Sequence, residues 1–265
     1  MELDTHSIND SSVQSVQRAF QLLRLVAHSD HGCRLGHLVE RSGLKKPTAH
    51  RLLRQLIADR FLVQSPGRLY QLGPSAFELG IAASRAFPLC ELAGPLLQDV
   101  AETTGDAVLL VVKSEADSLC VDHRQGSFSL KDSEVVPGYR RPIGVGAGGL
   151  AILGFLAPSD QQACLDEVGR KLEARRYGNL TVPRLYQLAM ETRERGWACL
   201  PHHAVPAITG IAAPLFDRQG RPFGAMTIRA STLRLTQPRT SESAALLQRA
   251  ARRLEQLLAG RSVQV

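Results

Sequence analysis

Residues 35–72 read LGHLVERSGLKKPTAHRLLRQLIADRFLVQSPGRLYQL. The apolar residues at the start predict a short helix that ends at Ser42-Gly43, because glycine suits the position just after a helix C-terminus. Pro47 then opens a second helix, since its fixed φ angle suits the first helical turn. This second helix carries an apolar stripe at helical spacing, formed by Ala49, Leu52, Leu53, Leu56 and Ile57. Two short helices joined by a tight turn predict a helix-turn-helix.

A further helix precedes this segment and a hairpin closes it. Apolar residues recur at helical spacing between Val16 and Ala27. Two β-like runs, 61–64 and 69–72, flank a turn that contains Pro66 and Gly67, which is typical of a hairpin. The order helix, helix, turn, helix, hairpin predicts a winged helix-turn-helix at residues 14–73.

Positive charge is concentrated in the same region. Residues 41–68 hold seven basic residues and one acidic residue, a net charge of +6, whereas the whole chain carries +7. The rest of the chain is therefore nearly neutral. A basic patch of this kind predicts a polyanionic partner for the winged helix-turn-helix and says little about the larger part of the chain. Non-specific nucleoid or RNA binding is an alternative that the confinement of the charge disfavours.

The helix that begins at Pro47 has the arrangement of a recognition helix, with its apolar stripe inward and its polar residues outward. Arginine can bind guanine with two hydrogen bonds, histidine and glutamine can bond base edges, and lysine suits phosphates. A merely solvated basic face is the structural alternative. We predict contacts with double-stranded DNA from Lys45, Lys46, Thr48, His50, Arg51, Arg54, Gln55 and, at the hairpin tip, Arg68.

The second half of the chain alternates between strand-like and helical patterns. Residues 74–92 predict a helical connector that Pro88 interrupts. Strands are expected at 107–113, 119–122, 208–216 and 223–229, and helices at 96–101, 148–156, 160–168, 183–195 and 242–259. Antiparallel strands with helices on their faces predict an α+β sensor-like domain.

Metal, cofactor and enzyme signatures are weak. The five cysteines are scattered without a C-x-x-C pair, which disfavours a disulfide framework and a zinc ribbon. Cys199 and His202 have a ligand-like spacing without a second pair, so a buried thiol is the better interpretation. His202-His203 is more consistent with a surface loop than with an acid/base pair. We expect no metal, no cofactor and no enzymatic activity; the alternative is an enzyme with an appended winged-helix DNA-binding domain.

Residues 142–159 contain no charge but include two prolines and five glycines. A short buried helix fits this composition better than a membrane span. The N-terminus carries acidic residues and lacks the apolar core of a signal peptide. We expect a cytoplasmic protein without membrane contact.

Residues 144–149 match G-x-G-x-x-G. A dinucleotide site would need a preceding strand, and residues 137–142 make a poor one. Two interpretations stay open. The glycines either leave free N–H groups at a helix start, where an anion is favoured, or allow a helix to pack tightly on a sheet.

Several stretches resemble the isocitrate-lyase-regulator (IclR) family of bacterial transcription factors. In the first half they are Val13–Ala19, Leu35–Leu53 and Leu69–Gly73. In the second half Pro142, Gly146–Gly149, Arg195–Trp197 and Ile211–Pro214 are similar to the effector-domain pattern. The resemblance covers almost the full length. It implies a winged-helix DNA-binding domain, a linker helix and a GAF-like α/β effector-binding domain with an antiparallel sheet, assembled as a homodimer or homotetramer.

These inferences divide the chain into a disordered tail (1–13), a winged helix-turn-helix (14–73), a linker helix (74–92) and an effector-binding domain (93–265). We expect a ligand-responsive transcriptional regulator of a catabolic operon that binds a pseudo-palindromic operator.

The resemblance also implies an effector pocket, carried over to Leu130, Ser133, Ala147, Gly148, Leu200, Ile208, Gly210, Thr227 and Arg229. Arg229 alternates with Thr227, so both side chains share one face of a strand. If this face points inward, Arg229 would need an anionic partner, and a carboxylate can accept two hydrogen bonds from its guanidinium group. The alternative is an outward Arg229 that is solvated. We expect a small carboxylic acid, aromatic or not, as effector.

Two departures from the family pattern limit this transfer. The run before the recognition helix is Lys45-Lys46-Pro47-Thr48 where the family usually has Pro-Lys-Ser/Thr-Thr, so the operator sequence is not carried over. Gly149-Leu150-Ala151 lacks the usual lysine, so a ligand contact through that lysine is not carried over either.

Overall fold

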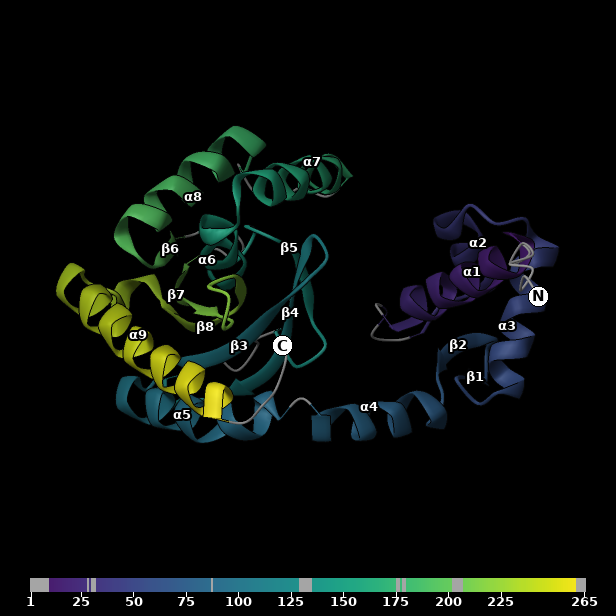
Figure 1. Ribbon diagram of the computed structural model, residues 1–265, viewed down its shortest axis with the longest axis horizontal. Coiled ribbons are helices and arrows are strands. Elements are labelled where there is room, and N and C mark those ends of the chain that lie inside the picture. Colours follow the sequence, from purple (N-terminus) through teal and green to yellow (C-terminus); the bar gives the residue numbers. More distant parts are fainter. Residues whose placement is uncertain are drawn as a thin grey trace, which may run out of the picture. The chain divides into compact units, whose positions relative to one another are not determined.

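The computed structural model of the chain describes residues 10–27, 29, 32–86, 88–128, 135–174, 177, 180–201 and 207–260. The chain divides into two units, Met1–Ala86 and Phe87–Val265, each with its own elements (Figure 1). We call them unit 1 and unit 2. Within the described ranges, no helix is both long enough and apolar enough to cross a membrane.

Unit 1 has the predicted winged helix-turn-helix order. Its elements are α1 (Asp10–Ala27), α2 (Leu35–Ser42), α3 (Lys46–Ala58), β1 (Leu62–Ser65), β2 (Leu69–Leu72) and α4 (Pro74–Ala86). Gly43 ends α2 with a φ of 67°, as its place in the sequence predicted. Residues 10–13 are helical, so the tail expected at 1–13 is wrong for them, because aspartate and serine favour the start of a helix. Residues 1–9 lie outside the described part.

The core of unit 1 joins α1, α2 and α3 to the hairpin. Its fully buried large side chains are Leu22, Leu38, Leu53 and Leu62. A feature that the sequence did not indicate is the pairing of Cys33 with Tyr70: their backbones exchange two hydrogen bonds, with N–O distances of 2.9 and 2.8 Å. This bridge ties the segment between α1 and α2 to the hairpin and holds the wing against the helices.

Unit 2 is built on one six-stranded antiparallel sheet in the order β5-β4-β3-β8-β7-β6. The strands are β3 (Ala107–Ser114), β4 (Asp117–Arg124), β5 (Arg140–Pro142), β6 (Ala198–Pro201), β7 (Ile208–Phe216) and β8 (Pro222–Ser231). We expected residues 137–142 to make a poor strand. This expectation is wrong for residues 140–142, which form β5. Both unpredicted strands, β5 and β6, lie at sheet edges and are too short to show an alternating pattern. The antiparallel sheet also excludes a dinucleotide-binding βαβ unit.

Helices cover both faces of this sheet (Figure 1). The elements α5 (Leu89–Thr104) and α9 (Gln237–Gly260) pack on one face, and α6 (Ala147–Phe155), α7 (Pro158–Ala174) and α8 (Val182–Arg195) on the other. Alternation along β3 serves both layers: Val108 packs toward α5 and α9, and Leu109 toward α6 to α8. The uncharged stretch forms a short buried helix, α6, as predicted.

The predicted connector at 74–92 is two helices. Helix α4 ends at Ala86, and α5 begins at Leu89 with Pro88 as its N-cap residue. The boundary between the units therefore lies inside the expected connector and not at its end, because proline can begin a helix but breaks one from within.

A buried carboxylate ties three elements of unit 2 together. Asp106 is 1% exposed. Its carboxylate accepts hydrogen bonds from Arg234 Nε at 3.0 Å and from Arg239 Nη2 at 2.8 Å. Both arginines also donate to the carbonyl oxygen of Thr104. The end of α5, the 3-10 turn η1 (Thr232–Arg234) and the start of α9 are thereby joined.

We expect Asp106→Ala to lower the free energy of unfolding of unit 2 by about 3 kcal/mol, because it leaves two cations without their carboxylate partner. Urea unfolding can be followed by the fluorescence of Trp197, the single tryptophan of the chain. Glu167→Ala, which removes a solvent-exposed ion pair with Arg170, serves as control and should cost less than about 1 kcal/mol. Equal losses in both variants would show that the Asp106 cluster adds no special stability.

Candidate functional sites

Helix α3 has the two faces that the sequence predicted. Ala49 and Leu53 are fully buried and Leu52 is nearly so. His50 and Arg51 are exposed. The other predicted DNA contacts on and beside this helix are exposed as well, namely Lys45, Lys46, Arg54 and Gln55, whereas Thr48 is half-buried. The exposed basic side chains of α3 therefore lie away from its buried apolar stripe.

The N-terminus of α3 differs from a capped helix. Lys45 is the N-cap residue, and no side chain there accepts a hydrogen bond from the helix. The first N–H groups thus stay available to an anion, next to two lysine side chains. Gln55 is less available, because its Nε2 donates to Asp59 Oδ2 at 3.0 Å.

The hairpin tip presents Arg68. The Arg68 N–H donates to the Ser65 carbonyl at 3.1 Å, and Gly67 has a φ of 87°, which suits a type II turn with proline and glycine in the middle. Arg68 itself has a φ of 60°, an uncommon value for a residue with a side chain. This backbone holds the exposed cation at the end of the wing.

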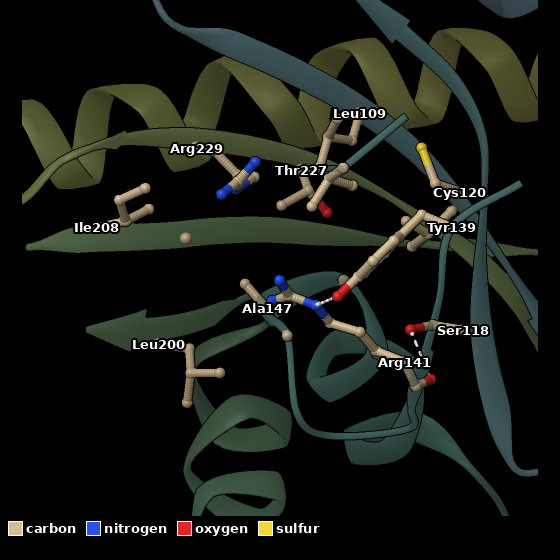
Figure 2. Close-up of a pocket in the computed structure, with 16 residues that line it drawn as sticks. Leu109, Ser118, Cys120, Tyr139, Arg141, Ala147, Leu200, Ile208, Thr227 and Arg229 are labelled. Atoms are coloured by element: carbon tan, nitrogen blue, oxygen red, sulfur yellow. Dashed lines mark hydrogen bonds between the residues drawn. The ribbon is translucent and has the colours of Figure 1, made fainter. Parts of the chain in front are cut away.

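Unit 2 contains a cavity of about 70 Å³ between the sheet and the start of α6 (Figure 2). One ordered water needs on the order of 10–15 Å³, so the cavity suits a small compact molecule. Seven of the nine predicted effector residues line it: Ala147, Gly148, Leu200, Ile208, Gly210, Thr227 and Arg229. The other two, Leu130 and Ser133, lie outside the described residues.

Sequence reasoning missed part of the lining. The additional residues are Leu109, Val111, Ser118, Cys120, Val135, Tyr139, Arg141, Gly146 and Gly149. Strand alternation offered a signal for Leu109 and Val111. Arg141 lies three residues before Gly144 in the sequence, but its place on an edge strand opposite Ser118 follows from pairing between distant segments. Leu150, where the family usually has lysine, is fully buried and does not line the cavity.

Arg229 and Thr227 both line the cavity from β8, as the alternation predicted (Figure 2). The alternative of an outward, solvated Arg229 is wrong, since the side chain is half-buried on the cavity face. Thr227 is 3% exposed, and its Oγ1 has no hydrogen-bond partner among the described residues. A buried hydroxyl without a partner is costly, and a bound polar ligand would supply one.

The glycines allow an unusually close approach of α6 to the sheet. A Cβ at Gly148 would lie 2.5 Å from Val111 Cγ2 and 2.7 Å from Thr227 Oγ1, and one at Gly210 would lie 2.8 Å from Ala147 Cβ. Gly146 is the N-cap residue of α6 and provides no side-chain cap. Tight packing therefore brings the uncapped helix start to the cavity wall, so the two interpretations of the glycines are compatible.

Two titratable groups on the cavity side of the sheet are neutral near pH 7. Burial raises the pKa of the Cys120 thiol to about 12. Burial lowers the pKa of His123, and the positive charge of Arg229 lowers it further. The neutral thiol therefore adds no negative charge to this side of the sheet, and the neutral imidazole adds no positive charge.

The metal hypothesis gains no support from the described part of the chain, where no three His, Cys, Asp or Glu residues gather into a metal-binding group. Cys199 is half-buried, and burial raises the pKa of its thiol, in line with the buried-thiol interpretation. His202 and His203 lie outside the described residues.

Comparison with known proteins finds a family match for each of the two units. Residues 82–256 match the family described as bacterial transcriptional regulator IclR C-terminal, and residues 15–66 match the IclR helix-turn-helix domain. The chain is 28% identical to the transcriptional repressor IclR of Escherichia coli, over 91% of this chain and 88% of that one. It is 31% identical to the glycerol operon regulatory protein of Streptomyces griseus, over 84% and 87%.

The fold also matches solved structures. An IclR homolog from Microbacterium hydrocarbonoxydans, crystallised in complex with 4-hydroxybenzoate, superposes with a TM-score of 0.73 at 20% identity, over 93% of this chain and 99% of that one. At this identity the likeness concerns the fold alone. Because the family matches span both the winged helix-turn-helix and the domain that holds the cavity, the chain belongs to the IclR family of bacterial transcriptional regulators.

Proposed function

We propose that the chain binds a pseudo-palindromic operator as a homodimer, or as a homotetramer of such dimers, and that a small carboxylic acid in the unit 2 cavity changes this binding. The regulator would act in the cytoplasm on a catabolic operon. One observation carries the proposal: exposed cations gather on α3 and the wing of unit 1, whereas unit 2 holds a separate cavity with Arg229 in its wall.

The DNA-binding part rests on α3. Arg51 and Arg54 are exposed on the face opposite the core, where they would reach base edges in a major groove. Lys45 and Lys46 flank the uncapped helix start, a position suited to phosphate contacts. Arg68 at the wing tip would reach the flanking backbone.

The effector part rests on the chemistry of the cavity wall. Arg229 offers a fork of N–H donors that matches a carboxylate, and the Thr227 hydroxyl and the start of α6 add donors nearby. Leu109, Leu200 and other apolar residues form the rest of the wall. The related structure with 4-hydroxybenzoate supports a small organic acid as the class of ligand. The relatives are named as regulators, which favours this function over an enzyme with an appended DNA-binding domain.

Dimerisation is supported by the apolar surface of unit 1. No described side chain of α4 is buried, and Phe77 and Ile81 are 71% and 45% exposed. Helix α1 exposes Val16 and Phe20. A short apolar helix of this kind is marginal alone in water, and such exposed residues mark a contact with a partner. A second copy meets this need, and two-fold symmetry also matches a pseudo-palindromic operator.

The effector would act by population shift. A ligand that binds one arrangement of the two units more tightly than another moves the chain toward that arrangement. The connector through α4 and Pro88 joins the unit that holds the ligand to the unit that holds α3, so it would transmit the change.

We expect Arg51→Ala to weaken operator binding by roughly 1–3 kcal/mol and to relax base preference, because a base-edge contact is lost. Lys46→Ala should instead lower the salt dependence of binding, since it removes a phosphate contact. Gel shifts at several salt concentrations, on DNA from upstream of the gene and on a scrambled copy, measure both effects. Unchanged affinity of Arg51→Ala would mean that α3 is oriented differently, and equal binding to both DNAs would contradict the regulator.

We expect Arg229→Ala to weaken carboxylic-acid binding at least tenfold, because the carboxylate loses a charge-assisted pair of hydrogen bonds. Titration calorimetry with a panel of aliphatic and aromatic acids on both proteins tests this. Arg218→Ala, at an exposed turn, is the matched control. If Arg229→Ala bound the acids as tightly as the unchanged protein does, Arg229 would have no part in effector binding.

We expect Phe77→Glu to weaken self-association at least tenfold, because a charge would be buried in an apolar contact. Sedimentation equilibrium over a range of protein concentrations measures the association. Leu233→Glu changes a side chain that is 92% exposed in unit 2 and should leave association unchanged. A Phe77→Glu protein that associates like the unchanged chain would rule out α4 as the contact.

A further inference from the structure

A second arginine lines the cavity, and the sequence did not assign it to the site. Arg141 lies on the edge strand β5 and is half-buried. Figure 2 shows its guanidinium group beside Ala147, the first residue of α6, and both residues line the cavity. The charged end of Arg141 therefore borders the space that a ligand would fill.

Tyr139 holds Arg141 by one nitrogen and leaves the others available. The Nε of Arg141 donates to Tyr139 Oη at 3.4 Å, and its guanidinium carbon lies 5.1 Å from the Tyr139 ring centroid. Of the five N–H donors of a guanidinium, only the one on Nε has a hydrogen-bond partner among the described residues. The two Nη groups lie side by side, and such a pair matches the two oxygens of a carboxylate.

The start of α6 offers further donors next to this arginine. Arg141 Cδ lies 4.0 Å from the position that a Cβ of Gly146 would have. The first N–H groups of a helix lack partners within it, and no side chain caps those of α6. The first three helical residues, Ala147, Gly148 and Gly149, all line the cavity. The partial positive charge of the helix start favours an anion at this place.

Thr227 points to a ligand independently of the helix start. It is 3% exposed, and its Oγ1 has no hydrogen-bond partner among the described residues. A Cβ at Gly148 would lie 2.7 Å from that Oγ1, so the hydroxyl meets the same helical turn that Arg141 approaches at Gly146. Donors from β5, α6 and β8 thus gather at the first turn of α6.

We propose that Arg141 is a further effector-binding residue, and that its Nη groups bind the effector carboxylate together with the start of α6 and the Thr227 hydroxyl. A carboxylate can accept about four hydrogen bonds, so one such group can be shared among several donors and the ligand needs no second charge. This inference rests on the proposed effector site. It adds a residue that selects charged ligands over neutral ligands of the same shape.

Arg140 offers a matched control. It is the neighbour of Arg141 on β5, but its Nη1 donates to Ser114 Oγ at 2.9 Å, and it does not line the cavity. A substitution there removes the same charge from the same strand without changing the cavity wall.

The test compares acids with their primary amides, which have nearly the same shape but no charge. Titration calorimetry is carried out with butyrate and butyramide, benzoate and benzamide, and 4-hydroxybenzoate and 4-hydroxybenzamide. At least one acid should bind the unchanged protein tenfold or more tightly than its amide. Arg141→Gln should lower the affinity for that acid at least tenfold and change the affinity for its amide by less than twofold.

Two further variants and a folding control complete the test. Arg141→Lys should lower the acid affinity at least threefold, because lysine keeps the charge but lacks the paired donors, and it remains informative if Arg141→Gln does not fold. Arg140→Gln should leave both affinities within twofold. Thermal unfolding verifies that each variant is folded.

The outcomes separate this inference from the proposed function. If Arg141→Gln binds the acid as the unchanged protein does, or loses acid and amide equally, Arg141 does not bind the carboxylate, while the carboxylic-acid site stands. An equal loss of acid binding in Arg140→Gln would also overturn the role of Arg141, since the charge of β5 as a whole would then be responsible. If no acid binds the unchanged protein more tightly than its amide, the carboxylic-acid effector itself falls.

Discussion

Contact between the start of α6 and the sheet, with almost no side chain in between, is the constraint on which unit 2 depends. Gly148 leaves no room for a Cβ against Val111 and Thr227, and Gly210 leaves none against Ala147. Any larger residue at these two positions would push the helix away from the strands. The close approach brings the backbone donors of the helix start within the same small cavity as the side chains of β8. A packing requirement and a binding surface thus arise from the same residues.

The same contact accounts for the polar groups of the cavity. Thr227 Oγ1 is buried by α6 and left without a partner in the described residues, and Arg229 is half-buried on the same strand face. A buried hydroxyl without a partner, such as that of Thr227, costs free energy unless something binds it. This energetic cost lies at the cavity, where a bound ligand can offset it. The rest of unit 2 packs as an apolar core in three layers, and the buried Asp106 cluster joins its elements at one end. Unit 1 places its own charges outward, on α3 and the wing, where water or DNA phosphates can reach them.

The sequence by itself determined whatever depends on neighbours along the chain. The helical period around Leu52, the turn residues Gly43 and Gly67, and the inward alternation of Thr227 with Arg229 are local patterns, because backbone geometry repeats every few residues. The clustering of basic residues at 41–68 is a fact of composition. These features predicted the winged helix-turn-helix, most elements of unit 2 and, with the family resemblance, seven residues that line one cavity.

The tertiary structure decided what depends on segments that are distant in the chain. The edge strands β5 and β6 are too short to have a period of their own and exist because a partner strand offers them hydrogen bonds. The bridge between Cys33 and Tyr70 has the same origin. Arg141 joins Arg229 in one cavity only because strand pairing places them there, 88 positions apart in the sequence. Long-range pairing is set by the packing of whole layers, and no local pattern encodes it.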